Sequence, residues 1–236
     1  MIPYKIHHIW FQGEIPKEYR SNYDKWGEFL SDWEHNIWNE SSLLELCSTR
    51  QKRDYQRLKT FIDRFNYLKY ILMFREGGVF ADLYTYPIKN LYPFFVEGKI
   101  HDINLQSLLS FRYPFNTEIP DYKPFGDYEV IIPARKMLLY YPNGKVSVML
   151  DNYVLMSTKR NLFWLNLIEW YKDKNSIKNL FEEPYRSGSY ELTDFVFNNY
   201  ANPYKEGILI LPETYFNGWD KEPNENMYIY HQKSII

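Results

Sequence analysis

The stretch from residue 60 to residue 82 constrains the fold most, because a helical pattern runs directly into two glycines and a short apolar segment. Its apolar side chains recur at intervals of four, three and four residues, at Phe61, Phe65, Leu68 and Leu72. This spacing predicts a helix over residues 60–76 with one apolar stripe facing the core. Gly77-Gly78 is expected to end the helix, since glycine readily takes the left-handed C-cap conformation. Residues 79–81 predict a buried strand, and Asp82 at its end lies where open α/β sheets bind ligands.

Short apolar runs alternate with helical patterns along the rest of the chain, which favours an α/β fold. Residues 4–11 and 35–38 are predicted strands on either side of a helix over 17–30, which together form an opening βαβ unit. A further helix is predicted over 161–171, and further strands over 104–111, 128–132, two pieces of 146–156 around Asp151-Asn152, 207–211 and 227–231. A length of 236 residues fits one large domain.

The composition excludes several classes of protein. Apolar residues make up 45% and charged residues 25%, which excludes disordered, collagen-like and coiled-coil chains as the main state. The formal net charge of -2 argues against non-specific nucleic-acid binding, which needs a basic surface. No run approaches the roughly 20 apolar residues that span a bilayer, and no signal-peptide pattern opens the chain. With one cysteine, Cys47, we expect a soluble, cytoplasmic protein whose contact with membranes, where it occurs, is peripheral.

Three polar side chains of the first stretch carry the candidate chemistry. Asn66 and Lys69 are three residues apart, so they share one face of the predicted helix beside its apolar stripe. With Asp82 they offer an amide, a cation and a carboxylate, which suit sugar hydroxyls, a phosphate and a divalent cation. Residues 48–75 hold eight Lys or Arg against two Asp, which is either a solvated helix face or a positive rim that attracts a polyanionic nucleotide.

Four segments carry a family resemblance, in this order: IHHIWFQG at 6–13, NYLKYILMFREGGVFADLY at 66–84, DNYVLMS at 151–157 followed by Phe163-Trp164, and ILP at 210–212 followed by YHQKS at 230–234. On these motifs, which span nearly the whole chain, the sequence resembles the family 32 glycosyltransferases, whose sugar-binding region contains an Asp-x-Asp (DXD) motif. The resemblance implies a GT-A fold, an α/β fold with one Rossmann-like domain over residues 1–236 and a mixed central sheet. It divides that domain into a nucleotide-sugar-binding half, 1–98, and an acceptor-side half, 99–236.

The resemblance also implies an activity and its residues. The activity is transfer of a hexose-type sugar from a UDP- or GDP-sugar to a hydroxyl of a glycan, lipid or protein, with retention of configuration and with Mn2+ or Mg2+. The matched donor-site residues are Trp10 for the nucleobase, Asn66 and Lys69 for sugar hydroxyls and phosphate, Phe80 for the nucleoside, Asp82 as the first motif acid, Asn152 for the sugar, and His231 and Ser234 for the diphosphate and metal. Asp82 and His231 are the implied metal ligands. Asp151 is the first candidate for a general base in a reaction that needs none when the leaving phosphate takes the proton.

The sequence departs from the family pattern at three donor-site positions. The motif is Asp82-Leu83-Tyr84, so a tyrosine replaces the second acid, the usual direct metal ligand. Asn66 replaces an Asp, and Lys69 replaces an Arg, which loses a bidentate fork. These departures predict altered donor choice, weaker metal dependence or lost activity. Either the Tyr84 hydroxyl contacts phosphate without a metal, or Asp82 and His231 hold one cation whose other ligands come from the diphosphate.

A purely structural role is the alternative for each candidate. Trp10 can fill the core, Lys69 can be a solvated lysine, Asp151-Asn152 can form a turn, and His231 can belong to a frayed tail. His7 and His8 alternate across a strand and are expected to be structural. A further set of aromatic residues either binds an acceptor sugar or only packs: Tyr113, Tyr122, Phe125 and Tyr128.

Three functions remain in competition at this level. The first is the glycosyltransferase. The second is a catalytically decayed module that binds a nucleotide-sugar or a glycan, which the missing second acid suggests. The third is a glycoside hydrolase, which needs two carboxylates about 5 to 9.5 Å apart, and no spacing in the sequence singles out such a pair.

Overall fold

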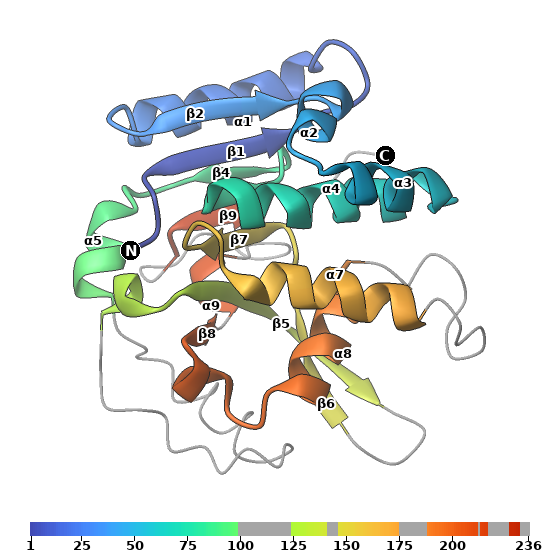
Figure 1. Ribbon diagram of the computed structural model, residues 1–236. Coiled ribbons are helices and arrows are strands. Elements are labelled where there is room, and N and C mark those ends of the chain that lie inside the picture. The colour runs from blue at the N-terminus through green and yellow to red at the C-terminus, as the bar shows by residue number, and fades with distance from the viewer. Residues whose placement is uncertain (99–123, 141–145, 175–187, 212, 217–226, 232–236) are drawn as a thin grey trace.

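A mixed sheet forms the centre of the computed structural model, which describes residues 1–98, 124–140, 146–174, 188–211, 213–216 and 227–231 (Figure 1). In this described part the sheet has seven strands in the order β2-β1-β3-β7-β5-β6, with β8 paired to β5. They are β1 (Lys5–Ile9), β2 (Glu34–Trp38), β3 (Gly78–Ala81), β5 (Val130–Tyr140), β6 (Val146–Leu150), β7 (Val154–Ser157) and β8 (Ile208–Leu211). A small antiparallel sheet pairs β4 (Thr85–Pro87) with β9 (Ile229–His231).

Helices cover both faces of the central sheet. Figure 1 shows α4 and α7 packed side by side in front of it and α1 behind β2. In chain order the helices are α1 (Lys17–Phe29), α2 (Glu40–Glu45), α3 (Thr49–Arg57), α4 (Phe61–Glu76), α5 (Tyr92–Glu97), α7 (Leu162–Lys174), α8 (Ser189–Asn199) and α9 (Glu213–Phe216), with short 3-10 turns at Phe125–Asp127 and Pro203–Glu206. No described helix is both long and apolar enough to cross a membrane. This α/β arrangement with a mixed sheet confirms the predicted fold class.

The strand pairing decides which loops meet. β1 runs parallel to both β2 and β3, which confirms the opening βαβ unit, whereas β3 is antiparallel to β7 and β7 is antiparallel to β5. The register places Ala81 opposite Val154. Residues from the two predicted halves, 1–98 and 99–236, therefore share one sheet, and the loop before β7 lies beside the end of β3.

The α4–β3 connection forms as the glycine pair predicts. Thr60 caps the start of α4 by accepting a hydrogen bond from the Asp63 amide at 3.1 Å, and Gly77, at φ +64°, ends the helix. A Cβ atom on Gly77 would lie 2.5 Å from the Lys159 amide, and one on Gly78 would lie 2.7 Å from the Lys5 carbonyl oxygen. Both positions therefore need glycine for the backbone angle and for close packing against neighbouring chain segments.

The single apolar stripe predicted for this helix is wrong. Phe61 is 52% exposed, while every residue from Asn66 to Met73 is buried. The reason is tertiary: α4 packs on β3 and β7 and is also contacted by α2, α3 and α7. Burial therefore surrounds the middle of the helix, and its polar residues there are buried as well.

Several other predictions need correction or lie outside the described residues. The strand predicted over 128–132 begins at Val130 and continues to Tyr140, and the prediction missed α2, α3, α5 and α8. The predicted strand over 104–111, with Tyr113 and Tyr122, lies outside the described residues. Phe125 and Tyr128 are buried in the core.

Candidate active site

Asp82 follows β3 directly and shapes a tight turn. Its backbone amide donates to the Tyr153 carbonyl at 2.8 Å, and its carbonyl accepts from the Thr85 amide at 2.8 Å. The side-chain Oδ1 accepts from the Tyr84 amide at 3.2 Å. Burial raises the pKa of Asp82, an effect that the Tyr84 amide and the Lys69 charge oppose. The turn holds a carboxylate at the carboxyl end of a buried strand, as the sequence predicts.

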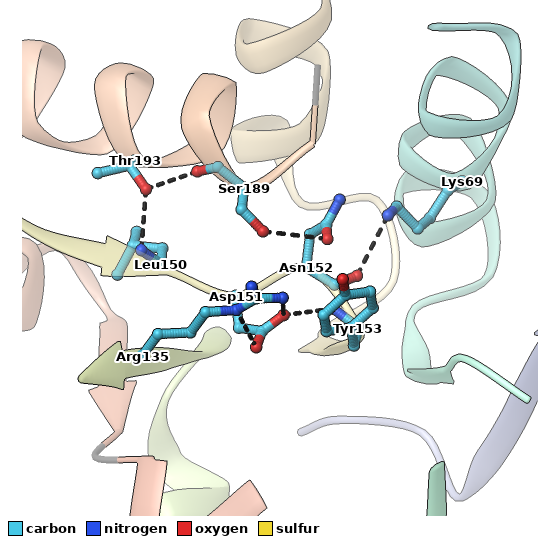
Figure 2. Close-up of polar contacts among 8 residues, drawn as sticks. All are labelled: Lys69, Arg135, Leu150, Asp151, Asn152, Tyr153, Ser189 and Thr193. Atoms are coloured by element: carbon cyan, nitrogen blue, oxygen red, sulfur yellow. Dashed lines mark hydrogen bonds and ion pairs between the residues drawn. The ribbon is translucent and has the colours of Figure 1, made fainter. Parts of the chain in front are cut away.

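Lys69 is a buried lysine, so the interpretation as a solvated side chain is wrong. It is 2% exposed, and its Nζ donates to the Asn152 carbonyl oxygen at 3.1 Å (Figure 2). The ammonium lies 5.1 Å from the centre of the Phe80 ring, within cation–π range. Burial lowers the pKa of Lys69, and the more distant carboxylates of Asp82, Asp151 and Glu191 partly counteract this.

Asn66 shares that buried face, and it contacts the same loop as Lys69. Its Oδ1 accepts from Asn152 Nδ2 at 3.3 Å, and Ser189 Oγ donates to Asn152 Oδ1 at 3.2 Å. Gly188, at φ +86°, permits this approach, because a Cβ there would lie 2.6 Å from Asn152 Nδ2. The Asn152 amide is thus held between α4 and α8.

Asp151 is paired with a cation that the sequence analysis did not identify. Arg135 Nε lies 2.8 Å from Oδ2, and Nη2 lies 3.4 Å from Oδ1, which gives a two-pronged contact (Figure 2). The Tyr153 amide also donates to Oδ1, at 3.1 Å, and the guanidinium lies 4.6 Å from the centre of the Tyr153 ring. With its oxygens engaged in these contacts, the carboxylate is arranged to hold the loop.

Aromatic rings form a continuous line along the same edge. The ring centres of Trp10 and Tyr19 are 5.8 Å apart, those of Tyr19 and Tyr84 are 4.8 Å apart, and those of Tyr84 and His231 are 6.4 Å apart. His231 then packs on Tyr153 at 4.5 Å. The line connects the predicted base-stacking residue to the loop that holds Asp151.

His231 is an ordered strand residue, so the interpretation as a frayed tail is wrong. It pairs with Thr85 in the small sheet and is buried. Burial lowers its pKa to about 4, so its imidazole is neutral at pH 7. His7 and His8 are also buried: Trp38 Nε1 donates to His7 Nδ1 at 3.1 Å, and His8 Nδ1 lies 2.7 Å from the Ala81 carbonyl. The contacts of His7 and His8 join neighbouring strands of the central sheet, as expected for structural residues.

Comparison with known proteins relates part of this chain to a glycosyltransferase family. The model for the "glycosyltransferase sugar-binding region containing DXD motif" matches residues 16–108. Residues 16–108, less than half of the chain, are therefore similar to that glycosyltransferase region. The matched residues include Asn66, Lys69, Asp82 and Tyr84, whereas Trp10, Asn152 and His231 lie outside them.

One curated protein and one solved structure extend this result. Inositol phosphoceramide mannosyltransferase 3 of Schizosaccharomyces pombe is 26% identical over 85 residues, which is 35% of this chain and 24% of that protein. The solved PaToxG glycosyltransferase superposes with a TM-score of 0.51 at 12% identity, over 87% of this chain and 72% of its own. The second similarity is one of fold, and it bears out the predicted GT-A arrangement.

The described residues contain no group of three His, Cys, Asp or Glu side chains that could hold a metal ion. Tyr84, at the position of the second DXD acid, packs its ring edge-on against the ring of Tyr19. Neutral His231 packs on Tyr153, and Ser234 lies outside the described residues. With one carboxylate, Asp82, where the motif has two, the described residues fit poorly the Mn2+ or Mg2+ that the resemblance implies, because these ions prefer carboxylate oxygens.

The structure brings most of the predicted glycosyltransferase residues together. Asn66, Lys69 and Asn152 are joined by hydrogen bonds, and Asp82 and Asp151 both act on the Lys69 charge. Phe80 is buried beneath the Lys69 ammonium and packs on Phe65. The sequence analysis missed Arg135, Tyr153, Ser189 and Tyr19. An arginine within the apolar run VIIPARKMLLY was the available signal for Arg135, while Ser189 gave none beyond the preceding glycine.

The basic region divides between surface and core. Lys69 is buried and Arg75 is half-buried, whereas six other cations are exposed on α3 and the start of α4: Arg50, Lys52, Arg53, Arg57, Lys59 and Arg64. Arg50 lies 3.4 Å from Glu169, an exposed pair that contributes little to stability. The solvated helix face therefore describes most of this region, and Lys69 is the exception.

Proposed function

We propose that this chain is a glycosyltransferase that moves a hexose from a UDP- or GDP-sugar to a hydroxyl of a glycan, lipid or protein acceptor. One observation carries the proposal: the buried Lys69 ammonium and the Asn66 amide both contact Asn152, and the backbone amide of Asp82 donates to the next residue of the same loop, Tyr153. The name of the fission-yeast relative, a mannosyltransferase, supports a hexose.

The residues take roles that follow from their chemistry. The half-buried ring of Trp10 offers a stacking surface for the nucleobase. The Asn66 and Asn152 amides suit sugar hydroxyls, because each presents both donors and an acceptor. The Lys69 ammonium attracts the diphosphate as a point charge. Asp82 orients the sugar or its diphosphate from the end of β3.

We further propose that the anomeric configuration is retained through attack of the acceptor on the face that the diphosphate leaves. The leaving phosphate oxygen takes the acceptor proton in this route, so a strong protein base is not needed. The Arg135–Asp151 pairing supports this route, because the carboxylate that would be the first candidate base is already engaged.

Turnover of the donor alone tests the proposal. The purified protein is expected to hydrolyse at least one UDP- or GDP-hexose slowly, measured as released nucleotide. Asp82→Ala is expected to abolish that release, because it removes the partly buried carboxylate beside Lys69. Asp32→Ala, an exposed acid outside the site, is the matched control. Unchanged turnover in Asp82→Ala would remove this residue from the reaction.

A decayed binding module is the second candidate function, and the tyrosine at position 84 favours it. Calorimetry with UDP-sugars and GDP-sugars, beside the turnover assay, separates the two: binding without release of nucleotide from any donor would establish the module. The glycoside hydrolase has less support, since Asp151 is held by Arg135 and is not available to work with Asp82 as an acid–base pair.

We also propose a reducing, cytoplasmic location. Cys47 is a free, buried cysteine, and burial raises the pKa of its thiol to about 11, so it stays protonated and unreactive. The exposed cations of α3 suit peripheral contact with an anionic membrane surface. Cell fractionation with and without high salt tests both statements.

A further inference from the structure

Lys69 is a buried cation that forms no ion pair with the described residues. A lysine ammonium has three N–H donors, and in the described part of the chain Nζ makes one hydrogen bond, to the Asn152 carbonyl oxygen at 3.1 Å. No described carboxylate forms an ion pair with it. Its other near neighbours are aromatic rings, with the ring centres of Phe80 at 5.1 Å and Phe65 at 5.6 Å. Burying an ammonium with so few partners is costly, which indicates a site that an anion completes.

Tyr84, which stands where the DXD motif has its second acid, is a poor ligand for a hard divalent cation. Its ring packs edge-on against the ring of Tyr19, with the ring centres 4.8 Å apart. Hard divalent cations prefer carboxylate oxygens, and a phenol hydroxyl is a poor substitute.

The Lys69 ammonium is the charge that the site offers to an anionic ligand. The carboxylates of Asp82 and Glu191 act on this charge without forming a described ion pair with it, while Asn66 and Tyr84 are neutral. Arg135 balances Asp151 within its own pair. A divalent cation placed beside Asp82 would find one carboxylate there, and it would add two positive charges next to the Lys69 ammonium, which repels it.

We propose that the site binds the diphosphate of its donor without a divalent cation, with the Lys69 ammonium as the counter-charge. This inference rests on the proposed function. In the transfer step, the bond between the anomeric carbon and the diphosphate oxygen breaks, and its electron pair stays on the diphosphate. The acceptor oxygen forms the new bond to that carbon, and its proton passes to a diphosphate oxygen. Lys69 stays protonated and stabilises the negative charge that develops on the leaving group.

Calorimetric titration of the whole chain with UDP and with GDP tests the inference, once in EDTA and once in Mn2+. At least one nucleotide is expected to bind with a Kd that differs by less than about threefold between the two conditions, because the proposed binding mode does not use the metal. A threefold change corresponds to less than the roughly 1.4 kcal/mol of a tenfold change in Kd. Lys69→Met is expected to weaken that binding in EDTA by about 10- to 100-fold, the usual effect of losing a charge-assisted hydrogen bond. Lys59→Met, which removes an exposed lysine outside the site, is the matched control and is expected to bind as the native chain does.

A second variant keeps the test independent of the buried substitution. Tyr84→Asp restores the second acid at a partly exposed position, and we expect Mn2+ to strengthen nucleotide binding to this variant and not to the native chain. Native binding that requires Mn2+ would overturn the inference and leave the proposed function standing. Failure of every nucleotide and nucleotide-sugar to bind in either condition would overturn the proposed function itself. Unchanged binding by a folded Lys69→Met, shown by its thermal melt, would also overturn the inference.

Discussion

Two cations at the edge of the sheet, the buried Lys69 and the half-buried Arg135, have different partners. Arg135 donates two hydrogen bonds to the Asp151 carboxylate, from Nε at 2.8 Å and from Nη2 at 3.4 Å. Lys69 donates one, to the Asn152 carbonyl oxygen, and forms no described ion pair. Asp82, the carboxylate with the largest effect on the Lys69 charge, accepts a hydrogen bond from the Tyr84 amide. The Arg135–Asp151 ion pair stabilises the loop that carries Asp151, whereas the Lys69 ammonium keeps N–H donors for a ligand. We therefore assign Arg135 a structural role and Lys69 a role in ligand binding.

Removing the paired arginine is expected to have the largest effect on stability. Arg135→Met leaves the Asp151 carboxylate, which is 5% exposed, without its cation. Breaking a buried pair from one side costs about 3 to 5 kcal/mol. We expect a loss of about 3 kcal/mol in the free energy of unfolding, measured by urea denaturation, because Arg135 itself is 17% exposed.

Arg53→Met, an exposed arginine on α3, is the control and is expected to change the free energy of unfolding by less than about 0.5 kcal/mol. The double variant Arg135→Met/Asp151→Asn is expected to recover part of the loss, because the stranded charge is gone. Equal effects of Arg53→Met and Arg135→Met would remove the distinction between Arg135 and Lys69.

Removing the unpaired lysine is expected to change stability in the opposite direction. Lys69→Met keeps the length of the side chain and deletes a buried charge, so we expect a gain of about 2 kcal/mol at pH 7, after allowance for the lost hydrogen bond. Burial lowers the pKa of Lys69 to about 8. Between pH 8 and the ordinary lysine range the unfolded chain holds more protons than the folded one, so native stability rises with pH there.

The advantage of Lys69→Met should therefore shrink as the pH rises above 8. Urea denaturation of both proteins at pH 7, 8 and 9 measures this difference, with Lys59→Met as the exposed counterpart. A loss of stability in Lys69→Met at pH 7 would show that the ammonium is well satisfied in the folded state, and the contrast with Arg135 would disappear.

The smallest expected effect on stability comes from Ser189, which helps to hold Asn152 between α8 and α4. Ser189 Oγ donates to Asn152, whose amide also contacts Asn66 on α4. Ser189→Ala removes one hydrogen bond and is expected to cost about 1 kcal/mol. Ser21→Ala, an exposed serine of α1, is the matched helical control. A cost no larger than that of Ser21→Ala would mean that Asn152 is held in place without α8.

The candidate site was predictable where the chemistry lies within one local unit. The helix, the glycine pair, the short strand and Asp82 follow each other along the chain, so their local patterns place the carboxylate at a strand end. Asn66 and Lys69 share a helix face by spacing alone. The burial of that face, the exposure of Phe61 and the tertiary partners of α4 were not predictable, because they depend on α2, α3 and α7 packing around the helix.

Contacts between distant segments decided the rest. The Arg135–Asp151 pair requires β5 and the end of β6 to lie in register, and the Tyr19–Tyr84 contact requires α1 to pack beside the turn after β3. The sequence by itself determined the α4–β3 unit, the α/β class and the order of the motifs, since each depends on neighbours a few residues away. Only the tertiary structure decided that Lys69 is buried with no ion pair among the residues described and that Asp151 is paired, since the partners of both are set by strand pairing and helix packing across the sheet.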